Sequence, residues 1–231
     1  MQDEQPLMDK MSERHHALTL TPGEGLVGLS VFQIDHPHQS TLTTLATLAT
    51  KGIRRESGVT GCAIFRGTAG RDLAIFTQWM GKPAYEQAPQ TLLKPPEQDL
   101  YQIAIVDHMS GQGTSQLSLE DWFFHFINVF PLRPGKRAAF IDFIARTLPI
   151  VRAQPGYIST NMLISLDARH AVNIGQFRTR QQWLAMSRRP RVLLAFSQGL
   201  RRRIVKRPPR LRVYDLVAVS MSPSTQMEPQ T

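Results

Sequence analysis

An internal repeat is the feature of this sequence that most restricts what the chain can fold into. Shifting the chain along itself by about 98 residues aligns similar stretches without a gap. The shift places Val31-Phe32 on Val129-Phe130, Arg54 on Arg152, Gly58 on Gly156, Arg71 on Arg169 and Gln78 on Gln176. Identities are few, but the pattern of apolar residues agrees along both copies. One structural unit therefore occurs twice, at 24–110 and at 120–222.

In both copies the apolar pattern predicts the same order of elements, because alternation indicates strands and a spacing of three or four indicates a helix. The first copy has a strand at 26–34, a helix opened by 38–40 with Leu42, Leu45 and Leu48 on one face, and strands at 59–65 and 73–80. The second has a strand at 122–132, a helix at 136–152, and strands at 157–166 and 171–177. Each copy then has a second helix and a last strand that starts at a tyrosine, Tyr101 or Tyr214.

The order is therefore the ferredoxin-like βαββαβ unit, which forms an antiparallel sheet with both helices on one face. The other face is apolar and needs a cover. We predict an α+β protein in which two such repeats cover each other as a pseudo-dimeric α/β barrel within one chain, joined by a linker at 111–119. This pseudo-dimer should be self-sufficient, and a further homodimer stays open. The ends 1–23 and 223–231, rich in Pro, Gln, Ser and Thr, are predicted to be disordered.

The net positive charge of the chain does not by itself indicate one function. The chain of 231 residues carries a formal charge of +9. Much of the excess lies in one late segment, at Arg188, Arg189, Arg191, Arg201, Arg202, Arg203, Lys206, Arg207, Arg210 and Arg212. A solvated helix and loop face, attraction of an anionic substrate, and nucleic-acid binding are all consistent with this segment.

Other classes of protein find little support in the sequence. No run of eighteen apolar residues occurs, and the start of the chain is polar and acidic, so we expect a cytoplasmic protein without a membrane span. The single cysteine, Cys62, lies in an apolar stretch and is expected to be a core residue. The histidine pairs at 15–16 and 36–38 have no ligand spacing that would indicate a metal site.

Three stretches of the second copy carry a family resemblance. They are Ile127-Asn128-Val129-Phe130 in the first strand, Gln154-Pro155-Gly156-Tyr157 before the second, and Val172-Asn173-Ile174-Gly175-Gln176-Phe177 in the third, followed by a polar stretch and Trp183. In this order they resemble the antibiotic biosynthesis monooxygenase family, whose repeats carry INxF, a PG[FY] turn and NxxxW at these places. The resemblance covers about 25–221 as two copies and is better in the second.

The resemblance implies a cofactor-independent oxygenase that acts on an aromatic polyketide-type phenol, anthrone or hydroquinone. Asn128 and Asn173 would be the catalytic amides that donate hydrogen bonds to a developing oxyanion. The substrate-binding aromatics would be Phe126, Phe130, Phe177, Trp183 and Trp79. Molecular oxygen would be the co-substrate, with no metal or haem, and a reduced flavin stays open. A quinone or a ring-cleaved product would result, and neither nucleic acid nor a membrane is an expected partner.

Alternation along the strands places Asn173 with Gly175 and Phe177, and Asn128 with Phe126 and Phe130. We expect Val172 and Ile174 to face the helices and both amides to point into the barrel. Buried amides need partners. These could be each other, Ser165, buried water or a ligand. His125 and Arg178 are the nearby candidates for a base.

The first copy departs from the family pattern and is expected to be degenerate as a site. It has Ser30 and Ile75 where the second has Asn128 and Asn173, although it keeps the tryptophan as Trp79. The second copy has Phe177 in place of that tryptophan, which preserves an aromatic wall but removes the indole N–H donor.

Three rival functions remain at this stage. A haem-degrading relative would need a histidine at Pro89 or Ser187. An RNA-recognition domain would need interleaved aromatics in the third strand, which 71–76 and 171–176 lack. A barrel that binds an aromatic ligand without catalysis, including a stress-response protein, fits the same residues.

Overall fold

The computed structural model describes residues 17–34, 38–52, 58–96 and 98–221. Most of the two predicted tails, 1–16 and 223–231, and the histidines at 15–16 and 36 therefore lie outside the described residues. Among the helices of the described residues, none is long and apolar enough to cross a membrane.

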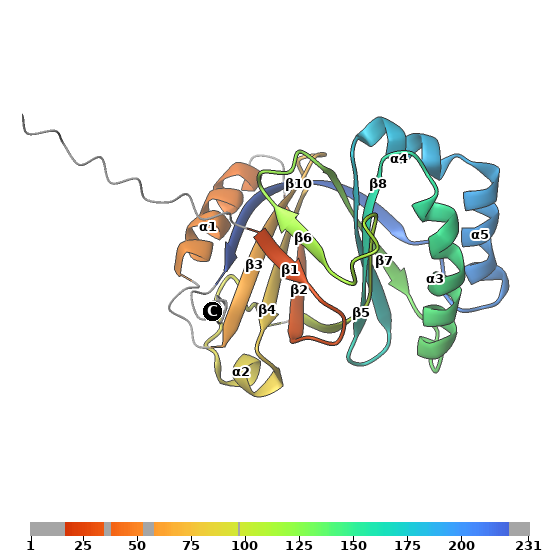
Figure 1. Cartoon of the computed structure of the whole chain (residues 1–231). Coiled ribbons are helices and arrows are strands. Elements are labelled where there is room, and N and C mark those ends of the chain that lie inside the picture. Colours follow the sequence, from red (N-terminus) through yellow and green to blue (C-terminus); the bar gives the residue numbers. More distant parts are fainter. Residues whose placement is uncertain (1–16, 35–37, 53–57, 97, 222–231) are drawn as a thin grey trace, which may run out of the picture.

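Eight strands form a closed antiparallel barrel (Figure 1). Their order around the barrel is β10-β3-β4-β2-β5-β8-β9-β7. The first repeat supplies β2 (Leu26–Gln33), β3 (Val59–Gly67), β4 (Asp72–Trp79) and β5 (Asp99–His108). The second supplies β7 (Phe124–Pro131), β8 (Tyr157–Ser165), β9 (His170–Phe177) and β10 (Arg210–Met221). The predicted fold class, with two ferredoxin-like repeats in an antiparallel α+β barrel, is confirmed.

The last strand of each repeat is shared between the two halves of the barrel. β5 pairs with β2 only from Asp99 to Tyr101, and then with β8 from Tyr101 to His108. β10 likewise pairs first with β7 and then, from Tyr214 onward, with β3. The two sheets are therefore joined by backbone hydrogen bonds as well as by side-chain packing.

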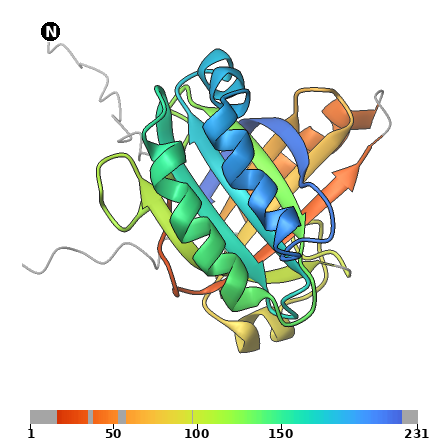
Figure 2. The same ribbon diagram turned by 90° about the vertical axis from the view of Figure 1, so that its right-hand side faces the viewer.

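Helices cover the outside of the barrel on both sides. α1 (Gln39–Gly52) and the short α2 (Lys82–Gln87) lie with the first repeat, and α3 (Arg137–Arg152), α4 (Arg180–Ser187) and α5 (Pro190–Arg201) lie with the second. Figure 2 shows α3 and α5 side by side across the second-repeat strands.

Two details of the predicted elements are wrong. Leu42 of α1 packs against the first-repeat core together with the buried Ala46, whereas Leu45 and Leu48 are exposed. Trp122 is 94% exposed and precedes β7 rather than starting it.

A small two-stranded sheet closes one end of the barrel. β1 (Ala17–Leu20) pairs antiparallel with β6 (Ser115–Ser118), and both lie in front of the barrel in Figure 1. Leu18, Leu20 and Leu117 are fully buried and belong to the cluster of interior residues. The predictions of a disordered end up to Gly23 and of a linker at 111–119 are therefore wrong at these two strands, because burial of three leucines stabilises them.

The barrel interior is filled by a mostly apolar cluster, which includes the aromatic rings of Phe65 and Phe76, and it also contains the buried His125. Ile127, Val172 and Ile174 belong to this interior cluster. His125 lies on the same face of β7 as Ile127 and is 2% exposed, with its ring edge-on to Phe65 at 5.8 Å. Burial lowers the pKa of His125 from its ordinary 6.5 to about 4.

This histidine should make the fold sensitive to acid. Because the unfolded chain binds the proton of His125 more readily, stability should fall between pH 6.5 and 4, by up to about 3 kcal/mol. His125→Gln should flatten this part of the curve of unfolding free energy against pH, measured by urea denaturation. His108→Gln, at the end of β5, is the control and should keep the wild-type slope. An unchanged slope in His125→Gln would contradict the assignment.

Candidate functional site

The two predicted amides lie side by side on the second-repeat sheet. Asn128 of β7 is the direct cross-strand partner of Asn173 of β9. Leu211 of β10 and Met162 of β8 continue the same row on either side. Directly opposed side chains on one face of an antiparallel pair are about 5 Å apart at Cβ. The two amides therefore form a pair in the middle of an apolar row.

Both amides point to the helices and not into the barrel, so the predicted direction is wrong. Val172 and Ile174 fill the interior instead. The predicted alternation is right, and only the choice of face is reversed. Side-chain size does not mark the inner face, because Phe65 and Tyr214 lie in the interior cluster while Phe126 lies on the helix side.

The amide pair lines a cavity of about 200 Å³ between the sheet and the helices. Its walls come from the strands of the second repeat, from α3, α4 and α5, and from the start of β10. The lining residues are Phe126, Asn128, Phe130, Ile144, Thr147, Leu148, Val151, Thr160, Met162, Asn173, Trp183, Met186, Ser187, Val192, Phe196, Pro209 and Leu211.

The side-chain oxygens of the two amides are unpaired acceptors in this cavity. Asn128 and Asn173 are each 8% exposed, and the buried Oδ1 atom of each has no partner among the described residues. Ser165, one of the expected partners, instead donates to Asp167 at 2.7 Å. Thr147 donates to the Phe143 carbonyl oxygen at 2.9 Å and Ser187 to that of Leu184 at 2.9 Å. A ligand that pairs with the amides would remove the cost of leaving them unsatisfied.

Phe126 and Trp183 form the aromatic end of the cavity. Their ring centroids are 5.6 Å apart with a tilt of 34°. Phe126 lies across its neighbour on β9, Gly175, where an added Cβ would come within 2.2 Å of the Phe126 ring. The absence of a side chain at Gly175 therefore leaves the space that the Phe126 ring occupies. Trp183 is held by the start of α4, where the Thr179 hydroxyl accepts a hydrogen bond from the Gln182 backbone N–H at 3.2 Å.

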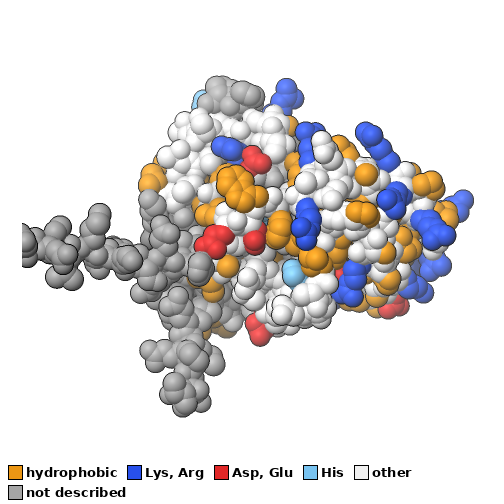
Figure 3. Space-filling view, turned by 45° about the horizontal axis from the view of Figure 1, so that its top comes forward, with side chains coloured by type: hydrophobic (Ala, Val, Ile, Leu, Met, Phe, Trp, Pro, Cys, Tyr) orange, Lys and Arg blue, Asp and Glu red, His pale blue; other side chains and the backbone are white. Residues whose placement is uncertain are grey.

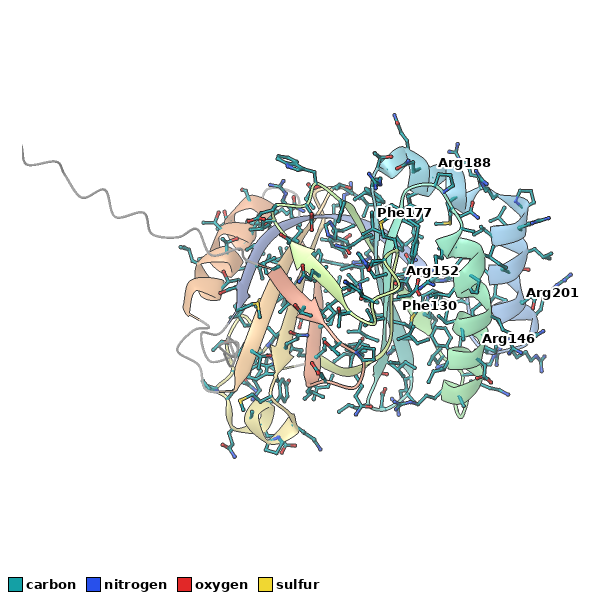
Figure 4. All side chains as sticks on the ribbon, viewed as in Figure 1. Phe130, Arg146, Arg152, Phe177, Arg188 and Arg201 are labelled. Atoms are coloured by element: carbon teal, nitrogen blue, oxygen red, sulfur yellow. The ribbon has the colours of Figure 1, made fainter. Side chains whose placement is uncertain are left out.

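Two of the five predicted aromatic contacts lie elsewhere. Phe130, Phe126 and Trp183 line the cavity. Phe177, labelled in Figure 4, is fully buried and packs edge-on against Tyr157, with ring centroids 5.8 Å apart. Trp79 belongs to the core of the first repeat, where its indole N–H donates to Thr77 Oγ1 at 2.9 Å. Trp79 is thus a core residue of the first repeat.

The two candidates for a base are also outside the cavity. His125 faces the barrel interior, where its Nε2 lies 3.2 Å from Gln176 Nε2, and Arg178 is exposed at the end of β9. No ionisable side chain is among the residues that line the described cavity.

The sequence analysis did not identify the cavity walls that the helices supply, such as Met186, Val192 and Phe196. The strong amphipathic pattern of 190–201 would have been the signal for the last two.

The first repeat has a filled core at the corresponding place. Ser30 and Ile75 are cross-strand partners, as Asn128 and Asn173 are. Ile75 is fully buried in a cluster that also contains Cys62 and Trp79. The described residues contain no cluster of three or more His, Cys, Asp or Glu side chains that could hold a metal ion.

Comparison with known proteins finds a similarity to one family in the second repeat. Residues 123–197 match the sequence pattern of the antibiotic biosynthesis monooxygenases. Tetracenomycin-F1 monooxygenase of Streptomyces glaucescens is 31% identical over 70 residues, which are 30% of this chain. The match spans 62% of that protein, less than two thirds of its length.

Solved structures share the fold over most of the chain. An anthrone oxidase-like protein superimposes with a TM-score of 0.74 at 15% identity, over 93% of this chain and 100% of its own. A major regulator of staphylococcal pathogenesis superimposes with a TM-score of 0.55 at 10% identity, over 84% of this chain and 99% of its own. The fold alone therefore does not decide the function.

Proposed function

Since residues 123–197 match the antibiotic biosynthesis monooxygenases and supply most of the cavity lining, we propose that this protein is an oxygenase of aromatic polyketide-type phenols, anthrones or hydroquinones. It would use O₂ without metal, haem or bound flavin and form a quinone or a ring-cleaved product. The observation that carries the proposal is the pair of Asn128 and Asn173, whose side-chain oxygens are unpaired, in a mostly apolar cavity.

The lining favours a flat, mostly apolar substrate with an oxygen substituent. Phe126 and Trp183 offer ring faces at one end, and Met162 and Met186 offer polarizable side chains that adapt to ring edges. An oxygen of the substrate would lie at the amide pair, since these are the groups with free hydrogen-bonding capacity. Each amide can donate from Nδ2 to an oxyanion.

The chemistry needs no outside reductant. A deprotonated anthrone or hydroquinone is electron-rich enough to reduce O₂, and a peroxide forms at the attacked carbon. Loss of water from this peroxide converts the anthrone CH₂ to a carbonyl, so one oxygen atom enters the quinone and the other leaves in water. Both oxygen atoms and all electrons are then accounted for.

The residues of this chain would stabilise charge and exclude water. Asn128 and Asn173 would stabilise the oxyanion, an effect worth roughly 3–4 kcal/mol for one donor in other oxyanion holes. The apolar walls would keep water away from the peroxide. Because the lining has no ionisable side chain, the acidity of the substrate itself would supply the anion.

Oxygen uptake with 1,8-dihydroxyanthrone tests the proposal. Protein dialysed against a chelator should consume O₂ above the enzyme-free rate, and ¹⁸O₂ should place one labelled atom in the anthraquinone. A rate equal to the blank would refute the oxygenase. A requirement for NADH and a flavin reductase would refute cofactor independence.

One observation favours a second function, binding of an aromatic ligand without catalysis. The cavity lacks a side chain that could act as a base at neutral pH. In that case calorimetry would show that the anthrone binds, while O₂ uptake stays at the blank rate. Haem degradation is less well supported, because Ser187 occupies the position of the haem-ligating histidine.

A further inference from the structure

The barrel has a second cavity, at the end opposite β1 and β6. Its volume is about 470 Å³, and it is separated from the amide pair by the sheet. It is lined by interior-facing residues of β2, β7, β9 and β10 and by the loop before β10. They are Val31, Gln33, Ile127, Val129, Pro131, His170, Arg207, Arg210, Arg212 and Tyr214.

Alternation along β10 separates the two cavities. Leu211 lines the cavity of the amide pair, whereas Arg210, Arg212 and Tyr214 line the second cavity. The exposed fraction of these side chains decreases toward the barrel interior. Arg210 is exposed, Arg212 is half-buried and Tyr214 is 1% exposed. The second cavity therefore runs from a basic rim to a tyrosine at its base.

Tyr214 lines the inner end of this cavity, and its hydroxyl is a buried polar group close to the Arg212 side chain. Its ring packs edge-on against Phe65 at 6.3 Å, and its oxygen has no hydrogen-bond partner among the described residues. Burial, and then the charge of Asp72, raise the pKa of Tyr214 to about 12. The hydroxyl therefore stays protonated at neutral pH and can donate a hydrogen bond to a ligand.

The rim carries uncompensated positive charge. Arg212 is paired with Asp72, with 2.6 Å between Nη1 and Oδ1. Arg207 and Arg210 are exposed and make no ion pair with the described residues. Planar guanidinium groups bind carboxylates in two-pronged geometry. Below the rim, Val31, Ile127 and Val129 offer an apolar wall.

We propose that this open end of the barrel binds an organic carboxylate with an apolar body, at a site distinct from the amide cavity. The carboxylate would meet Arg207 and Arg210, the body would lie against Val31, Ile127 and Val129, and the Tyr214 hydroxyl would donate to an acceptor at the inner end. The volume of about 470 Å³ suits a small-molecule ligand.

The test is titration calorimetry with 6-hydroxy-2-naphthoate, which has a carboxylate, an apolar body and a far oxygen. The double variant Arg207→Gln/Arg210→Gln should weaken binding at least 10-fold, and Tyr214→Phe several-fold. The matched control is Arg188→Gln/Arg201→Gln, which removes the same charge from the outer surface of the helices. Lysines and arginines gather over that half in Figure 3, and Arg188 and Arg201 project outward in Figure 4. This control should bind as the wild type does.

Two further arms separate the sources of binding. Asn173→Leu, which fills the amide cavity, should leave the naphthoate affinity unchanged, so failure of the proposed oxygenase would not affect this result. The neutral 6-hydroxy-2-naphthamide should bind at least 10-fold more weakly. Equal loss in the Arg188/Arg201 control, equal binding of the amide, or equally tight binding of inorganic phosphate would each overturn the proposal.

Discussion

Asn128→Ala and Asn173→Ala are each expected to lower the rate of anthrone oxygenation about 10²-fold while leaving the melting temperature nearly unchanged. The rate should fall because each variant removes a donor that acts on the developing oxyanion. Stability should hold because neither Oδ1 atom has a partner to lose in the ligand-free protein. Initial O₂ uptake and thermal unfolding of the same preparations measure the two effects.

A third asparagine of the same repeat is the matched control. Asn161 of β8 is fully buried on the interior face, donates to the Ile174 carbonyl oxygen at 3.0 Å and to Ser159 Oγ at 3.3 Å, and is contacted by the Ser115 hydroxyl. Asn161→Ala should cost about 1–3 kcal/mol of unfolding free energy, because it leaves several groups unpaired. Its rate per folded molecule should stay near that of the wild type.

Ile75→Ala, in the other repeat, is expected to lower stability rather than activity. Ile75 occupies the position in the first repeat that Asn173 occupies in the second, but it is fully buried in a packed cluster, so its truncation should cost roughly 2–5 kcal/mol of unfolding free energy.

Full oxygenation activity in both Asn128→Ala and Asn173→Ala would show that these amides take no part in the mechanism. A large loss of stability in the same two variants would show that they hold the fold instead.

The repeat made the architecture predictable from sequence. Two copies of a βαββαβ pattern leave few ways to bury two apolar sheet faces, and Asn128 and Asn173 were expected to approach each other, as their cross-strand pairing confirms. Period-two alternation then selected the residues that share a face, among them Phe126, Phe130 and Gly175.

The side of the sheet could not be predicted in the same way. Every residue of β8 from Tyr157 to Ser165 is buried, and β9 is buried from Ala171 to Phe177. Alternation separates polar from apolar only where one face meets water. Here both faces of the sheet contact protein. The sequence pattern therefore shows which side chains share a face, but not which face lines the barrel interior.

Short elements escaped prediction for a related reason. β1 and β6 have four residues each, too few for periodicity to be recognised. Each is stabilised by the other and by the barrel end, and these contacts join residues about a hundred positions apart. The local sequence therefore reads as tail or linker although Leu18 and Leu117 are core residues.

Separate expression of the two halves should fail, because the closing strands are shared between them. A chain of residues 1–112 keeps β5 but loses β8, its partner from Tyr101 to His108, and leaves β3 without β10 and β1 without β6. Exposed strand edges and an uncovered apolar sheet face should drive aggregation or self-pairing.

Co-expression supplies the control for this loss. Residues 113–231 provide the missing strands, and the break between Gln112 and Gly113 lies in an exposed turn. The two pieces together should therefore form a soluble one-to-one complex that unfolds cooperatively, measured by light scattering and thermal melting. A soluble, cooperatively unfolding monomer of 1–112 alone would show that the first sheet does not need the second, and the barrel would then be two domains in contact rather than one core.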